Sequence, residues 1–186
     1  MKIESKKLYL DEEYSESEDN IYDQYHEYSY RIGSFLMDFS SLEDTIDSLL
    51  IERINDRSHE FGFQTIKLFK FKQKIILLRD NYKSLIRYLS SDSKKLRLLS
   101  IVDSSYADLV KLSEFRNKVA HANWETLDKN FFVTTDVKED TQGVYFVRTK
   151  ISCRLLYNAS RKCGSLSKRI FNDHEKILDN TLRRRM

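Results

Sequence analysis

Apolar residues recur at three- and four-residue steps through most of this chain, the period of a helix with one buried stripe. Four segments show it, at about residues 30–57, 65–89, 94–120 and 152–182. Residues 55–62 separate the first helical segment from the second, and residues 90–93 offer an N-cap for the third. The sequence has no proline and four glycines, so little in it interrupts a helix. It therefore predicts a mainly α fold, a helical bundle of four to five helices.

Between the third and fourth segments the pattern changes. Residues 131–137 and 144–149 are rich in β-branched and aromatic side chains, and the polar residues 138–143 separate them. Such a pattern is typical of two strands joined by a turn. We expect a β-hairpin over about residues 131–150, directly before the C-terminal helix.

The third helical segment ends in Phe115-Arg116-Asn117-Lys118-Val119-Ala120-His121. At 100° per residue, Asn117 and His121 share one face, a turn apart and nearly opposite the apolar stripe. Arg116 lies at the edge of the buried side. A continuous helix therefore does not bring Arg116 and His121 together unaided. Either the helix loosens near its C-terminus, or a second copy of the motif contributes.

The motif resembles the Arg-x4–6-His signature of the HEPN domain family, because four residues separate Arg116 from His121. Asn117 matches the polar residue that frequently follows the arginine in that family. The resemblance extends over about residues 30–182. It includes the Leu42-Glu43 pair in the first helix and the segment that leads through Trp124 to the last helix. The resemblance implies a dimer with two motifs beside one cleft. It also implies a metal-independent endoribonuclease of a toxin–antitoxin, abortive-infection or antiphage system. Residues 122–124 lack the tyrosine that one subgroup carries after its histidine.

These residue types suit RNA cleavage. His121 can act as general base or acid, and Arg116 can hold phosphate oxygens of a transition state rich in negative charge. Asn117 would orient His121 or bind phosphate, and Lys118 is a candidate phosphate contact. Glu43 lies on the apolar stripe of the first helix, where it would position Arg116, tune His121 or form an ordinary structural salt bridge. We expect no cofactor and find no convincing metal-ligand cluster.

Two other functions stay open at this point. One is a non-catalytic HEPN module that binds RNA or serves as an adaptor. The other is a structural dimerisation protein, in which His121 caps the helix and Arg116 forms an ion pair. His26, His59 and His174 have no partner at a suggestive spacing, and we interpret all three as surface residues.

Charge divides the chain unevenly. Residues 1–30 contain three lysines and nine acidic residues, a net charge of −6, so the total of +3 leaves +9 for the remainder. We divide the chain into an acidic, tyrosine-rich arm over residues 1–29 and a HEPN-like helical domain over 30–186. The arm is either loosely docked or a lid that RNA displaces from a basic groove.

The expected partners are RNA, a second copy of the chain and an antitoxin or defence-system protein. We expect no membrane association, because no apolar run is long enough to span a bilayer. A cytoplasmic location is expected, and Cys153 and Cys163 are interpreted as inert, reduced thiols.

Overall fold

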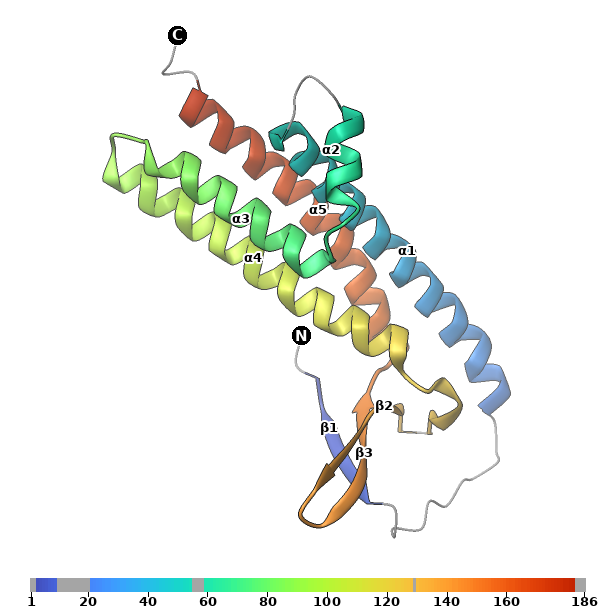
Figure 1. The fold of residues 1–186 in the computed structure, drawn as a ribbon. Coiled ribbons are helices and arrows are strands. Elements are labelled where there is room, and N and C mark those ends of the chain that lie inside the picture. Colours follow the sequence, from blue (N-terminus) through green and yellow to red (C-terminus); the bar gives the residue numbers. More distant parts are fainter. Residues whose placement is uncertain (1–2, 10–20, 55–58, 129, 183–186) are drawn as a thin grey trace. The chain divides into compact units, whose positions relative to one another are not determined.

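The computed structural model describes residues 3–9, 21–54, 59–128 and 130–182. Over these residues the chain forms five α-helices, one short 3-10 helix and three strands (Figure 1). The elements run in the order β1 (Ser5–Tyr9), α1 (Ile21–Ile54), α2 (His59–Ile66), α3 (Phe71–Arg87), α4 (Asp92–His121), η1 (Trp124–Thr126), β2 (Phe132–Asp140), β3 (Gly143–Lys150) and α5 (Cys153–Leu182). The prediction of a mainly helical bundle with a hairpin before the last helix is confirmed.

The chain divides into two compact units. Unit 1 contains residues 1–37 and 114–160, and unit 2 contains residues 38–113 and 161–186. Helices α1, α4 and α5 each contribute residues to both units.

Unit 1 is built around an antiparallel sheet in the order β1-β3-β2. Strands β2 and β3 form the predicted hairpin, but they extend further than expected, so that the connecting turn is only Thr141 and Gln142. Gly143 closes this turn with a φ of 121°, a conformation that favours glycine. The sheet continues directly into α5.

Strand β1 was not predicted, since residues 5–9 fall in the segment interpreted as an arm. It pairs with β3 from Ser5 opposite Thr149 to Tyr9 opposite Tyr145. Lys7 also donates a 2.7 Å hydrogen bond to Asp140 at the end of β2. The sequence of β1 is short, polar and without alternation, and it becomes a strand because β3 offers it an edge. Residues 10–20 of the expected arm lie outside the described residues, and α1 already begins at Ile21.

Unit 2 is a bundle of α2, α3 and the adjoining parts of α1, α4 and α5 (Figure 1). The second predicted helix, at 65–89, is in fact two helices, because residues 67–70 leave the helical conformation between α2 and α3. Buried apolar side chains from every helix form the core. They include Phe39, Leu42, Ile46, Ile66, Ile75, Ile86, Leu112, Leu166, Ile170 and Ile177.

Candidate functional site

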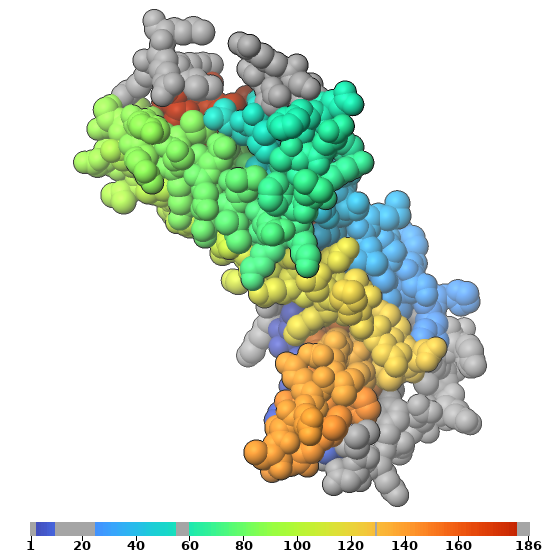
Figure 2. Space-filling view, viewed as in Figure 1, coloured from blue at the N-terminus to red at the C-terminus, as the bar shows by residue number. Residues whose placement is uncertain are grey.

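The residues of the Arg/His motif occupy the last two turns of α4, in unit 1. Phe115 and Val119 point into the core, while Asn117 and His121 are exposed and Arg116 is half-buried. Figure 2 shows the C-terminal part of α4 and the segment after it, in yellow, at the surface in that view. The face that carries Asn117 and His121 is thus the one the helical period predicts.

Arg116 turns toward this exposed face. Its Nη1 donates a hydrogen bond of 3.3 Å to Oδ1 of Asn117. Asn117 lies one turn before His121 on the same face, so its amide stands between the other two polar side chains of the motif. The structure therefore joins Arg116 to Asn117, and it leaves His121 a turn away.

The helix does not loosen at its end. α4 is α-helical without interruption from Asp92 to His121. The first of the two ways to unite Arg116 and His121 is therefore not realised, and only a second copy of the chain remains.

The imidazole of His121 faces solvent. Within the described part of the chain it has no hydrogen bond or ion pair, and it is the last residue of α4. Lys118, in the same turn, is half-buried. Basic residues in the last turn of a helix suit the negative end of its dipole, which is a purely structural role open to Lys118 and His121.

Several contacts fix the end of α4. The indole Nε1 of Trp124 donates to the carbonyl oxygen of Val119 at 3.0 Å, and the Trp124 ring packs on that of Tyr28 with centroids 5.8 Å apart. The backbone N–H of Asn123 donates to the carbonyl oxygen of Thr134 at 2.8 Å. Trp124 is thus a packing anchor, and the motif lies on a helix whose exit is held in place.

Arg148 of β3 is the structural residue that sequence reasoning missed here. Its side chain is 2% exposed, and its guanidinium donates to the carbonyl oxygens of Thr126 and, at 2.8 Å, Phe132. It also lies 3.5 Å from a carboxylate oxygen of Asp128. An arginine in a β-branched, aromatic strand was the only sequence signal for this role.

Glu43 belongs to unit 2, where its partner is a buried lysine. Lys74 of α3 is 5% exposed and donates to Glu43 at 3.1 Å and to Asp47 at 2.8 Å. Burial opposes the charge on Lys74, but the hydrogen bonds to these carboxylates outweigh it and raise the lysine pKa. Of the roles considered for Glu43, the structure shows the ordinary salt bridge.

A second group of polar side chains is buried in unit 2. His174 is 1% exposed, and its Nδ1 lies 2.8 Å from the hydroxyl of Tyr82. The prediction of a surface histidine is therefore wrong for His174, while His26 is exposed and the side chain of His59 lies outside the described set. His174 lies four residues after Ile170 and three before Ile177 on the buried stripe of α5, a spacing that could have revealed its burial.

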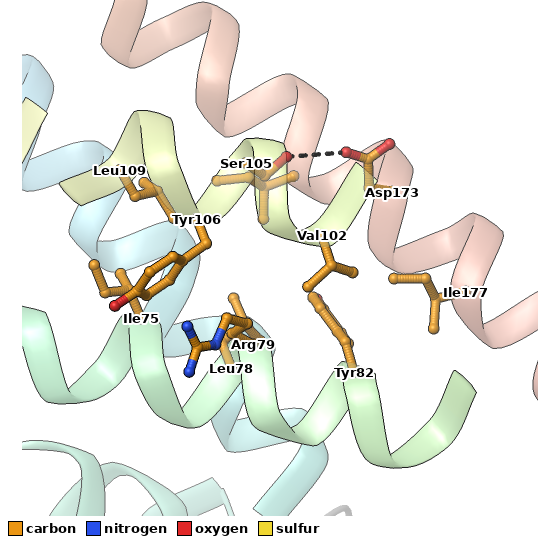
Figure 3. Close-up of a pocket in the computed structure, with 11 residues that line it drawn as sticks. Ile75, Leu78, Arg79, Tyr82, Val102, Ser105, Tyr106, Leu109, Asp173 and Ile177 are labelled. Carbon is orange, nitrogen blue, oxygen red and sulfur yellow. Dashed lines mark hydrogen bonds between the residues drawn. The ribbon is translucent and has the colours of Figure 1, made fainter. Parts of the chain in front are cut away.

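A small cavity of about 20 Å³ adjoins this group, between α3, α4 and α5 (Figure 3). Ser105 donates across one side of it to Asp173 at 3.4 Å, and the guanidinium of Arg79 lies 4.3 Å from the ring centroid of Tyr106 on another. The volume admits about one water molecule. The cavity is too small for a substrate.

The remaining candidate chemistry is sparse. Cys153 and Cys163 are free thiols, and burial raises the pKa of Cys163 to about 12. No cluster of three or more His, Cys, Asp or Glu side chains is arranged for a metal ion in the part of the chain that is described. Nor do the described helices include one long and apolar enough to cross a membrane.

Comparison with family models, with curated proteins and with solved structures finds no match to this chain.

Proposed function

We propose that this protein is a metal-independent endoribonuclease of the HEPN type, acting as a toxin or antiphage effector. The observation that supports it best is the arrangement at the end of α4. Asn117 and His121 are exposed one turn apart, and Arg116 bends toward them through its hydrogen bond to Asn117. The exposed imidazole of His121 is open to a substrate, as a general base requires.

In the proposed reaction the ribose 2′-hydroxyl is the nucleophile. His121 removes its proton as the oxygen attacks phosphorus, and the bond from phosphorus to the 5′-oxygen breaks. The leaving 5′-oxygen takes a proton from water, which yields a 2′,3′-cyclic phosphate and a 5′-hydroxyl end, and the imidazolium of His121 returns its proton to solvent. Arg116 binds the non-bridging oxygens, whose negative charge is greatest in the transition state.

A homodimer would complete the site. Arg116 and His121 are five residues apart on an unbroken helix, which separates them by about 140° around its axis. The two side chains therefore leave the helix on different sides, and within one copy Arg116 reaches Asn117 but not His121. Two copies with their α4 ends adjacent would place the imidazole of one beside the guanidinium of the other.

The decisive experiment incubates the purified protein with single-stranded RNA in EDTA. We expect fragments with 2′,3′-cyclic phosphate ends from the wild type, and a loss of at least 100-fold in rate for His121→Ala. His26→Ala is the matched control, because His26 is also an exposed helical histidine. An RNA with a single 2′-deoxyribose should resist cleavage at that position only.

The same variants test the biological role. Expression of the wild type should arrest growth of a bacterial host, and His121→Ala should relieve the arrest. RNA binding without cleavage by the wild type would contradict the enzyme and favour the adaptor. Equal cleavage by His121→Ala would exclude the assigned general base.

A further inference from the structure

Unit 1 carries a second group of exposed side chains, formed by α1 and α5. The guanidinium carbon of Arg31 lies 5.6 Å from the ring centroid of Tyr30 and 5.3 Å from that of Tyr157. Tyr30 is 68% exposed and Tyr157 is 45% exposed. We propose that Tyr30, Arg31 and Tyr157 form a stacking platform that binds the unpaired bases of single-stranded RNA. This inference rests on the proposed function and names its substrate class.

Exposure of both rings is the first argument. Tyrosine rings that served only to pack α1 on α5 would be covered on most of their surface. Here two aromatic rings stay open to solvent while they contact one arginine. Stacking on an aromatic ring is available to every base, which suits a binder without strict sequence preference.

The side chain of Arg31 has few polar contacts, which also supports the platform. Its Nε is buried and lacks a hydrogen bond among the described residues, and Glu27 lies 3.7 Å away as a weak ion-pair partner. The guanidinium is therefore held mainly by its contacts with the two rings. A planar cation held in this way can stack on a base or donate to a phosphate.

Charge around the platform is the third argument. Arg154 is exposed on α5, three residues before Tyr157, so both side chains lie on neighbouring parts of one helix face. No ion pair of Arg154 is found within the described residues. A cation beside two open rings matches a strand that alternates bases with phosphates.

Single-stranded RNA fits this surface better than a duplex. Bases in a duplex are paired and stacked on one another, so their faces are not available to protein side chains. An unpaired strand exposes those faces. The proposed cleavage also requires a flexible ribose, because the 2′-oxygen must align with the leaving 5′-oxygen.

Binding is best measured separately from cleavage. The His121→Ala protein, in EDTA, is titrated into a fluorescein-labelled 12-nucleotide RNA without secondary structure, and anisotropy gives Kd. We expect Tyr30→Ala and Tyr157→Ala each to weaken binding about tenfold. Tyr157→Phe should bind like the parent, because the ring and not the hydroxyl makes the contact. Tyr88→Ala is the matched control, since Tyr88 is 75% exposed on the other unit.

Two further measurements sharpen the assignment. Arg154→Gln should reduce the slope of log Kd against log salt by about 0.7, the value for one phosphate contact on a single strand. A duplex of the same sequence should compete at least tenfold more weakly than the single strand. Circular dichroism melting of each variant verifies that it folds.

The outcomes separate this inference from the proposed function. Weaker binding by the tyrosine variants, in a protein that cleaves no RNA, would support the platform and refute the ribonuclease. Unchanged binding in variants that fold would overturn the platform, whether or not the wild type cleaves. A shift from dimer to monomer with unchanged RNA affinity would also overturn it and assign this surface to a protein interface.

Discussion

The hydroxyl of Tyr82 lies 2.8 Å from Nδ1 of His174, and both side chains are at least 96% buried in the helical core of unit 2. Their rings also contact at a centroid distance of 5.8 Å. The other nitrogen of His174 has no hydrogen bond within the described residues, and Glu52 lies 3.5 Å from it. The Tyr82 hydroxyl therefore provides the main polar contact of this histidine.

We predict that Tyr82→Phe lowers the free energy of unfolding by about 1–3 kcal/mol, because it leaves a buried ring nitrogen without its partner. The double variant Tyr82→Phe/His174→Phe should recover part of this loss, since neither residue then carries an unpaired polar group. Urea denaturation at pH 7 measures both. Tyr88→Phe, on an exposed tyrosine, should change nothing, and a double variant less stable than the sum of its parts would refute the explanation.

Alanine substitutions at Gly33 of α1 and Gly62 of α2 should change the stability of the protein in opposite directions. A Cβ at Gly62 would lie 2.9 Å from Cγ2 of Ile51, whereas a Cβ at Gly33 meets no heavy atom within 4 Å. We expect Gly62→Ala to destabilise the protein by about 1–3 kcal/mol through overpacking. Gly33→Ala should stabilise it by about 0.5–1 kcal/mol, because alanine loses less backbone entropy in a helix. Thermal melts of the two variants give the comparison, and a shared direction would contradict it.

The helices were predictable because their apolar stripes repeat over many turns, as in the segment from Ile32 to Leu50 that became part of α1. Strand β1 was not, because its five residues have no period of their own and depend on the edge of β3. The sequence also did not predict that the second helical segment divides into α2 and α3. Residues 67–70 contain no proline or glycine, and the local signal there is the side chain of Gln73, which accepts a hydrogen bond from the backbone N–H of Lys70 and caps α3.

At the candidate site, the sequence predicted which faces of α4 are buried and which are exposed. It could not predict the partner of Glu43, because Lys74 lies 31 residues away on another helix. His174 and Arg148 were missed for a related reason. The apolar stripe of α5 could have revealed that His174 is buried, but its partner Tyr82, and the carbonyl oxygens that Arg148 binds after α4, are brought near only by the fold.

Asp108 should make stability depend on pH in the acid range. Burial raises its pKa, but hydrogen bonds of 2.7 Å from Lys162 and from Arg169 outweigh burial, and the pKa lies below its ordinary value. Since the folded pKa is below the unfolded one, Asp108 stabilises the protein above about pH 4, and this stabilisation is lost as pH falls through the folded pKa.

We therefore predict that Asp108→Asn reduces stability at pH 6, by up to about 1 kcal/mol for such part-exposed pairs, and has less effect at pH 3. Urea midpoints at the two pH values measure the difference. Asp44→Asn, which removes an exposed carboxylate on α1, is the control for the loss of one acidic group. A variant whose deficit is the same at both pH values would show that the ion pairs do not cause it.

The guanidinium of Arg148 binds two carbonyl oxygens and lies near Asp128 in the segment that follows α4. Arg148→Met keeps much of the side-chain volume but removes the donor to both carbonyl oxygens and the cation beside Asp128, so that only the backbone N–H of Asp128 still donates to the Phe132 oxygen. We expect a loss of about 2–5 kcal/mol in the free energy of unfolding. Amides between residues 123 and 133 should exchange with solvent faster than those of the helical core, because the lost contacts are local. Arg154→Met, on an exposed arginine of α5, should keep wild-type stability, and equal exchange in the 123–133 segment of Arg148→Met and wild type would refute the assigned role.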